Sequence, residues 1–392
     1  MSDTVLADVA QVVMGQSPDG ATYNKNGIGF PLLNGPAEFG GLIPMAVQWT
    51  TDPAKFAESG DILFCVRGNT LGRQNMADQR YAIGRGLAAI RARDGKADTD
   101  YIGLWLRYRA ASLLAAGNGS TFPSVSGDYL ESLPFPEISA SEQRQAAASL
   151  KAQLAEVETA RQAVQAQRLD VEGLLLALYR EAFVQIAPVA VPPTFDDSPP
   201  GWQWHKLTDI ARLESGHTPS RSRPDWWGGD VSWISLTEIR ALDGQWVEGT
   251  QLRTNAAGVA NSAARILPHG TVCYSRTASV GFVAIMAQPM ATSQDFANWV
   301  CSDALDPEFL MHALIRARKE LRALATGATH KTIYMPTLES FRVCAPDPDT
   351  QRRIVRALKQ RLADATTLRA ALDAQRAELE NLPQRLLAQA FE

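Results

Sequence analysis

The chain has 392 residues, of which 45% are hydrophobic and 20% charged, and its formal net charge is −4. The length suits two or three domains of ordinary globular composition, and the scattered cysteines argue against a disulfide scaffold or a zinc site. The N-terminus lacks a basic region and no apolar run approaches the roughly 20 residues of a membrane span, so we expect neither a signal peptide nor a membrane protein. We therefore expect a cytoplasmic protein, and any binding to nucleic acid must rely on locally placed arginines.

The sequence contains an internal repeat. The opening "LADVAQVVMGQSP" at Leu6 returns as "LTDIARLESGHTP" at Leu207, and "GDILFCVRGNTLG" returns as "GTVCYSRTASVG". From Gly119 onward the two copies keep an offset of 208 residues, as between Gln143 and Gln351. The repeat predicts two related domains, each followed by a long helix.

In chain order, the runs "GDILFCV" and "GTVCYS" have the apolar character of buried strands. Residues 100–117 and 306–326 have helical spacing and end near a glycine. Residues 141–183 and 349–391 are rich in Ala, Leu, Gln, Glu and Arg, which favour helix. The fold class is therefore α+β: two mixed domains and two long helices. The proline-rich stretch 188–203 is expected to be an extended linker.

Both long helices carry a heptad seam, which predicts that they pack on each other as an antiparallel coiled coil. Pro383 is expected to kink or restart the second helix. The arginines in the seam either fix the register or extend out to solvent along their aliphatic stems. The seam comprises Leu150, Leu154, Val157, Arg161, Val164, Arg168, Val171, Leu175, Leu178, Leu358, Leu362, Ala365, Arg369, Leu372, Arg376, Leu379 and Leu386.

Motifs of catalysis are missing. The chain has neither a phosphate-binding glycine loop nor H-E-x-x-H, and its histidines have no metal-ligand spacing. The proline pairs in "VPPT" and "SPPG" lack the flanks of the adenine methyltransferase motif. We therefore expect no enzyme active site, no metal site and no cofactor in this chain.

Two related but different domains on a helical spacer suit a bipartite, asymmetric DNA site. The layout resembles the specificity subunit of type I restriction–modification systems over essentially the whole chain. The resemblance is carried by "SGHTP", the two glycine-flanked strand segments, "TGATHKTIYMPTLESFRVCAPDPDTQRRI" and "LENLPQRLLAQAF", which occur in the family's order.

This resemblance implies a target recognition domain at residues 1–140, a spacer helix at 141–187, a linker at 188–203, a second target recognition domain at 204–348 and a spacer helix at 349–392. It also implies double-stranded DNA, two methylation subunits and restriction subunits as partners. S-adenosylmethionine and ATP with Mg²⁺ would be cofactors of those partner subunits, which carry the adenine methyltransferase and ATP-dependent endonuclease activities.

Polar and basic residues in the glycine-flanked loops are the candidates for contact with DNA, because Arg, Asn and Gln read base edges and bind phosphates. In the first domain they are Arg67, Asn69, Thr70, Arg73, Gln74, Asn118, Ser120 and Thr121. In the second domain they are His217, Ser220, Arg221, Arg223, Arg276, Thr277, Ser279, Thr329, His330 and Lys331.

Other roles compete for several of these residues. Arg67 and Arg276 occupy matching positions, which favours a structural or phosphate-binding role over base reading. Arg221, Arg223 and Lys331 have no counterpart, so they suit specificity, or else are solvated surface charges. The pair Trp226 and Trp227 either stacks on a base or belongs to the core.

Two rival functions remain open at this point. A protein adaptor with two binding heads on a rod fits the same layout, and the acidic net charge favours it slightly. An enzyme is the third alternative, and the missing motifs speak against it. A steep loss of affinity with salt distinguishes DNA binding from the adaptor.

Overall fold

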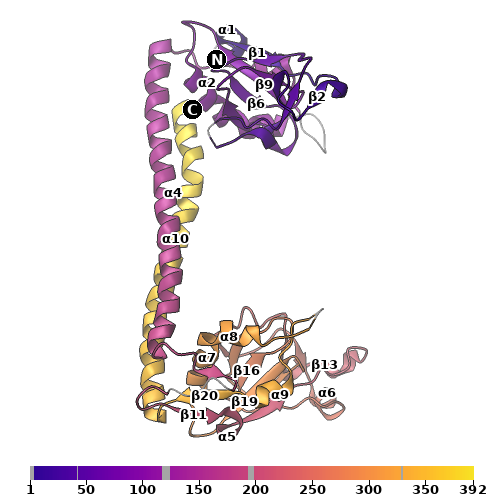
Figure 1. Ribbon diagram of the computed structural model, residues 1–392, viewed down its shortest axis with the longest axis vertical. Helices are drawn as coiled ribbons and strands as arrows, with labels where there is room; N and C mark the ends of the chain where they lie inside the picture. The colour runs from indigo at the N-terminus through magenta and orange to yellow at the C-terminus, as the bar shows by residue number, and fades with distance from the viewer. Residues whose placement is uncertain (1–3, 42, 117–123, 193–197, 328–329) are drawn as a thin grey trace. The chain divides into compact units, whose positions relative to one another are not determined.

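The computed structural model describes residues 4–41, 43–116, 124–192, 198–327 and 330–392. These form two compact units, one built from residues 1–166 and 373–392 and the other from residues 167–372. Each unit joins a mixed α/β domain to a stretch of both long helices, α4 (Ala140–Ala182) and α10 (Pro348–Phe391) (Figure 1). The unit boundaries therefore cut across both long helices.

The first unit contains two sheets, one in the order β1-β9-β6-β7 and the other in the order β2-β4-β3-β8-β5. The strands are β1 (Ala10–Met14), β2 (Tyr23–Asn24), β3 (Phe30–Leu33), β4 (Gln48–Thr50), β5 (Phe56–Ala57), β6 (Ile62–Cys65), β7 (Gln74–Met76), β8 (Tyr81–Ile83) and β9 (Leu87–Ala92). The helices α1 (Leu6–Val9), α2 (Thr99–Ala116) and α3 (Gly127–Glu131) complete the domain. Its main core joins the first sheet to α2, α3 and the ends of α4 and α10 that lie in this unit.

The second unit repeats this plan with a sheet in the order β12-β19-β16-β17-β14. Smaller sheets have the orders β15-β13-β18 and β10-β20-β11. The strands are β10 (Val189–Ala190), β11 (Gln203–Lys206), β12 (Ala211–Ser215), β13 (Trp227–Ile234), β14 (Trp246–Val247), β15 (Arg253–Thr254), β16 (Val272–Ser275), β17 (Val283–Met286), β18 (Ala291–Thr292), β19 (Phe296–Cys301) and β20 (Arg342–Ala345). The short helices are α5 (Leu207–Ile210), α6 (Ala256–Ala260), α7 (Pro307–Arg316), α8 (Arg318–Ala323) and α9 (Met335–Glu339).

The repeat in the sequence is a repeat in topology. The strands β1, β9, β6 and β7 take the same places as β12, β19, β16 and β17, with antiparallel pairing between equivalent neighbours. The parallel pair β3–β8 likewise matches the parallel pair β13–β18. The α+β class and the two repeated domains are confirmed. The predicted helix at 306–326 is instead two helices, α7 and α8, which part at Ala317.

The long helices run antiparallel within each unit. In the first, Leu150 of α4 and Leu387 of α10 share one core. Arg161, later in α4, contacts the backbone at Leu379, which is earlier in α10. In the second, Glu181 near the end of α4 pairs with Arg361 at 2.8 Å.

Most seam residues are buried or half-buried, but Arg369 and Arg376 are open to solvent, and Leu387 is more deeply buried than Leu386. The helix α10 continues through Pro383.

The helix α4 ends at Ala182, one residue before the end of the run that favours helix and five residues before the spacer boundary at 187 that the resemblance implies. Val184 and Gln185 adopt left-handed backbone angles, with φ of 45° and 67°, and the Gln185 N–H donates to the Arg180 carbonyl at 2.7 Å. Phe183 is fully buried, with its ring 5.3 Å from that of Phe309. Burial of Phe183 in the second unit therefore turns the chain out of the helix. The described part of the expected linker includes the strand β10 and the first residue of β11.

Candidate nucleic-acid interface

The turns that follow β1 and its equivalent β12 accept only glycine. A Cβ on Gly15 would lie 2.2 Å from the Gly84 carbonyl oxygen, and one on Gly216 would lie 2.2 Å from the Thr292 hydroxyl oxygen. His217 follows this turn, and its N–H donates to the Thr292 carbonyl at 3.0 Å while its own carbonyl accepts from the Trp233 indole at 3.2 Å. The backbone at His217 is thus fixed, and its side chain is exposed.

The loop that follows His217 is held by tryptophans. The Trp227 indole donates to the Ser220 carbonyl at 3.2 Å, and the Trp227 and Trp233 rings meet edge to face at 5.0 Å. The guanidinium of Arg221 lies 5.3 Å from the centre of the Trp227 ring and 5.8 Å from that of Trp233. The exposed Arg221 is therefore held in place by a cation–π contact, with no carboxylate pairing it among the described residues.

Arg223, two residues further on, is engaged differently. Its guanidinium forms two hydrogen bonds with the Asp225 carboxylate, at 2.9 and 2.7 Å, and lies 4.7 Å from the centre of the Trp226 ring. Hydrogen bonding to Arg223 lowers the pKa of Asp225, so the pair is ionised and neutral overall at pH 7. Trp226 and Trp227 are half-buried, so their exposure is intermediate between that of a core residue and that of a free stacking surface.

In the first unit, the loop between β6 and β7 carries most of the predicted contacts. Arg67, Asn69 and Arg73 are exposed, and their side-chain polar groups have no hydrogen-bond partner among the described residues, although the Arg67 carbonyl accepts from the Thr70 hydroxyl at 3.5 Å. Thr70 turns inward instead, with its hydroxyl 3.3 Å from the Cys65 sulfur. Gln74 lies in β7, with its amide oxygen near Gly103 of α2, so it faces the helix.

The equivalent loop of the second unit, between β16 and β17, uses its arginine internally. Arg276 donates to the carbonyls of Gln294 at 2.8 Å and Ile333 at 3.4 Å. Burial lowers the pKa of Arg276, although an arginine so placed remains protonated at pH 7. The two matching arginines thus differ: Arg67 is exposed, whereas Arg276 ties three segments of its domain together.

A second loop lies beside the first in each domain. The backbone of Arg67 pairs with that of Ser124, and the backbone of Thr277 pairs with that of Thr332. The Lys331 carbonyl also accepts from the Ala278 N–H at 2.9 Å, while the side chains of His330 and Lys331 are exposed. The structure therefore brings together loops that the sequence separates by more than fifty residues in each copy. The predicted contacts Asn118, Ser120, Thr121 and Thr329 lie outside the described residues.

A group of arginines around Phe282 was not among the contacts predicted from the sequence. Arg240, Arg318 and Arg322 place their guanidinium carbons 5.7, 5.5 and 5.2 Å from the centre of the Phe282 ring. We refer to these four residues as the Phe282 arginine cluster. It adjoins the predicted contact Ser279, whose hydroxyl lies 3.5 Å from Arg240. The spacing of Arg318 and Arg322 on one helical face was the available signal, but Arg240 lies far away in the sequence.

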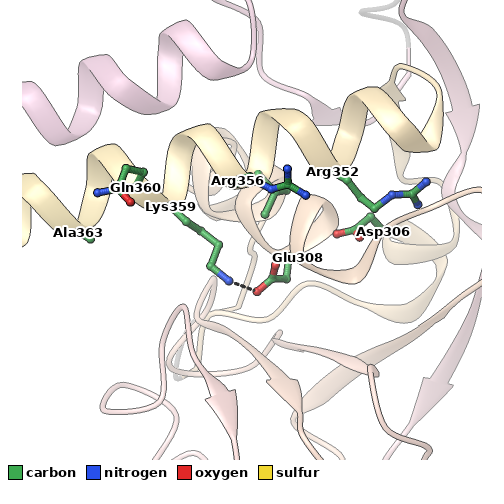
Figure 2. Close-up of a pocket in the computed structure, with 8 residues that line it drawn as sticks. Asp306, Glu308, Arg352, Arg356, Lys359, Gln360 and Ala363 are labelled. Carbon is green, nitrogen blue, oxygen red and sulfur yellow. Dashed lines mark hydrogen bonds and ion pairs between the residues drawn. The ribbon is translucent and has the colours of Figure 1, made fainter.

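A groove on the second unit lies between α10 and the start of α7. Figure 2 shows Lys359 of α10 paired with Glu308 of α7, with Arg356 and Arg352 earlier on the same helix. The Lys359–Glu308 distance is 2.6 Å, and the Trp246 indole donates to the same Glu308 oxygen at 2.7 Å. Burial tends to raise the pKa of Glu308, but hydrogen bonds from Lys359 and Trp246 bring it below the ordinary value.

The first unit repeats this ion pair between Lys151 of α4 and Asp100 of α2, at 2.8 Å. The groove is therefore a place where a long helix is fastened to its domain. It does not have the features of a reaction centre, because its central carboxylate is already neutralised.

Within the described ranges, no group of three or more His, Cys, Asp or Glu residues is arranged to hold a metal ion. The helices of those same ranges are also too short or too polar to cross a membrane.

The comparisons with known proteins agree with this architecture. The sequence profile of the type I restriction modification DNA specificity domain matches residues 3–165 and again residues 199–375. The chain belongs to this family and carries two copies of its domain.

Curated relatives share parts of the chain. A putative type I restriction enzyme MjaX specificity subunit from Methanocaldococcus jannaschii is 38% identical over 142 residues, which cover 36% of this chain and 33% of the relative. The HindI specificity subunit from Haemophilus influenzae is 24% identical over 174 residues, which cover 43% of this chain and 38% of the relative. The aligned part thus spans between 33% and 38% of the length of these relatives.

Solved structures match over nearly the full length. One belongs to a study of complex assembly and conformational transition of the type I R-M system, with a TM-score of 0.76 at 21% identity, covering 99% of this chain and 97% of the other. The HsdS subunit from Thermoanaerobacter tengcongensis gives a TM-score of 0.66 at 21% identity, covering 99% of this chain and 95% of that subunit. At this level of identity, the likeness concerns the fold.

Proposed function

We propose that this chain is the non-catalytic DNA-specificity subunit of a type I restriction–modification complex. Each of its two recognition domains would read one half of a bipartite, asymmetric site in double-stranded DNA. The observation that carries the proposal is the presence of two copies of one family domain, with equivalent paired loops that present different side chains.

The differences between the loops are of the kind that reading two sequences requires. The first unit exposes Arg67, Asn69 and Arg73 from its β6–β7 loop. The second unit turns the matching Arg276 inward and instead exposes Arg221 beside two tryptophans. Guanidinium and amide groups make the specific contacts to base edges in the major groove, so different placements of these groups favour different bases.

On this proposal the chemistry belongs to partner subunits. Two methylation subunits would use S-adenosylmethionine to methylate adenine, and restriction subunits would use ATP and Mg²⁺ to cut DNA. This chain would bind both kinds of subunit and hold them at the site, in the cytoplasm where the DNA lies. It would bind no cofactor of its own.

The test is a genome-wide map of adenine methylation in host cells with and without the gene. We expect deletion to abolish methylation at one split motif, made of two short half-sites with a fixed gap, and we expect the gene on a plasmid to restore it. An unchanged methylation map, with the methyltransferase shown to be expressed, would contradict DNA recognition. The chain would then act as a protein adaptor, the alternative that its acidic net charge favours.

A further inference from the structure

We propose that the Phe282 arginine cluster binds a phosphate group of the DNA backbone, with Arg240 and Arg322 as the contacting residues. This assignment deepens the proposed function and rests on it. It adds a contact to the DNA backbone at residues that were not predicted from the sequence.

Charge is the first argument. The cluster contains three guanidinium groups, and the carboxylate bonded to it is that of Asp243, which accepts two hydrogen bonds from Arg318 at 2.7 and 2.8 Å. Asp243 also accepts from the Val283 N–H at 3.0 Å, so Arg318 and Asp243 form a structural pair against β17. Arg240 and Arg322 have no carboxylate partner among the described residues.

The two remaining arginines are held so that their terminal nitrogens stay open to a ligand. The Arg322 Nε donates to the Val280 carbonyl at 2.7 Å, which leaves the two terminal nitrogens of this guanidinium for a ligand. Arg240 makes only a long contact of 3.5 Å, from a terminal nitrogen to the Ser279 hydroxyl. Both side chains are exposed, and their guanidinium carbons lie 5.7 and 5.2 Å from the centre of the half-buried Phe282 ring. The ring partly offsets the repulsion between the like charges, because its face is electron-rich.

The electrostatics of this surface also favour an anion. Burial and the neighbouring charge of Arg318 and Arg240 lower the pKa of Arg322, although Tyr274 and Asp243 act in the opposite direction. A bound anion relieves the repulsion between the arginines. Arginine and hydroxyl groups supply several donors at once, and phosphate oxygens only accept, so the fit is with a phosphate.

Position supplies the third argument. The cluster adjoins the β16–β17 loop at Gly281, whose φ is +93°, and a Cβ there would lie 3.1 Å from atoms of Arg318 and Arg322. In the first unit the equivalent glycine, Gly72, lies against Ala110, the residue that matches Arg318 in the repeat. The residue that matches Arg322 is Leu114, which is also uncharged. The site is therefore a feature of the second unit and not a shared part of the scaffold.

The experiment uses the full chain assembled with the methyltransferase subunits encoded beside it. Binding is measured on two labelled duplexes of equal length, one with the methylated motif and one without it, over a series of salt concentrations. The variants are Arg240→Gln and Arg322→Gln. The control is Lys319→Gln, which removes the same charge from an exposed residue of α8.

We expect Arg240→Gln and Arg322→Gln each to weaken binding to both duplexes by a similar factor, about tenfold. The slope of log affinity against log salt should become shallower by about 1 per variant, and the methylated motif should not change. Lys319→Gln should change affinity and slope by much less. Arg240 makes no strong internal hydrogen bond, so its variant remains informative if Arg322→Gln is poorly folded.

Three results would overturn the assignment. Wild-type affinity and slope in Arg240→Gln would show that the cluster does not contact DNA. If Lys319→Gln had equal effects, the two arginines would act only through the overall charge of the surface. A loss confined to the motif duplex would make the arginines base-reading residues. If the wild-type assembly bound neither duplex, the proposed function itself would fail, which is a distinguishable result.

Discussion

The guanidinium of Arg161 on α4 donates two hydrogen bonds to the backbone of α10, to the Leu379 and Glu380 carbonyls, both at 3.1 Å. Leu379 is the residue four positions before Pro383, and a helical carbonyl normally accepts from the N–H four residues later. Proline has no N–H, so the Leu379 carbonyl lacks its usual partner. Arg161 supplies the missing donor from the neighbouring helix.

Replacing Arg161 with Met should therefore lower the free energy of unfolding by about 1–3 kcal/mol, because it leaves the Leu379 carbonyl without a donor. The measurement is chemical denaturation of the full chain, followed by circular dichroism. The matched control is Arg369→Met at the equivalent position of the repeat, where the side chain is exposed. That variant should be within about 0.5 kcal/mol of wild type.

A second variant, Pro383→Ala, tests the cause. Alanine restores the N–H that bonds to the Leu379 carbonyl, so Arg161→Met should cost less than half as much in the Pro383→Ala background. A double-mutant cycle gives this coupling energy, which we expect to be about 1 kcal/mol. Additive effects of the two substitutions would show that the proline and the arginine act independently.

The contact between Arg161 and Leu379 could not be predicted from the sequences of the two helices. Their extents and their packing on each other follow from composition and heptad spacing, which depend on local propensity and on burial along one face. The role of Arg161 depends on its partner across the helix pair, which no pattern within one helix encodes. The repeat even suggests equal roles for Arg161 and Arg369, but the residue that matches Pro383 in the first copy is Leu175.

Substitution of the matching loop arginines Arg67 and Arg276 should affect stability differently. Arg276→Met removes the donors to the Gln294 and Ile333 carbonyls, and it should destabilise the second unit by about 1–3 kcal/mol. Arg67→Met removes an exposed side chain, and it should leave stability within about 0.5 kcal/mol while weakening DNA binding. Thermal unfolding and DNA binding, measured on the same preparations, check both statements. Equal losses of stability in the two variants would contradict the distinction.

The candidate site, too, could be predicted from the sequence only in part. Glycines and polar residues predict where the loops are, because turns need those residue types. Whether an arginine in such a loop faces solvent or the backbone depends on segments distant in sequence. Arg276 bonds to residues 294 and 333, and the Phe282 arginine cluster joins residue 240 to the α8 helix. Such groupings arise only from the tertiary fold.

Arg221 should determine part of the sequence preference of the second unit. We expect Arg221→Ala to relax or abolish recognition of one half of the methylated motif and to leave the other half intact, with a cost of about 1–3 kcal/mol if a bidentate base contact is lost. The measurement is methylation mapping in cells that carry the variant. The control is Arg223→Ala, which should have a smaller effect because the Asp225 carboxylate already neutralises that arginine.

Trp227 positions Arg221 and should affect the same half of the motif. Trp227→Leu removes both the ring under the guanidinium and the indole donor to the Ser220 carbonyl. We expect reduced methylation at the half-site affected by Arg221→Ala, and partial recovery in Trp227→Phe, which keeps an aromatic face. Equal loss at both half-sites would indicate a general folding defect instead of a positioning role.

His312 gives the second unit a predictable dependence on pH. Burial lowers the pKa of His312 to about 4 from the ordinary value of 6.5, and its Nδ1 lies 3.1 Å from the hydroxyl of the half-buried Tyr179. Between these two pH values the unfolded chain binds a proton at this residue and the folded chain does not. The contribution of the neutral histidine to the free energy of unfolding is therefore complete above about pH 6.5. It is lost progressively as the pH falls toward 4, by up to about 3 kcal/mol.

The first unit provides the variant that removes this effect. The residues that match Tyr179 and His312 in the repeat are Leu387 and Leu104, both buried. The double substitution Tyr179→Leu with His312→Leu should therefore be tolerated, and it should flatten the pH dependence of the free energy of unfolding between about pH 4 and 6.5. Because carboxylates also titrate in this range, the decisive quantity is the difference between wild type and variant at each pH. That difference should change with pH, and a constant value would contradict the assignment of the titration to His312.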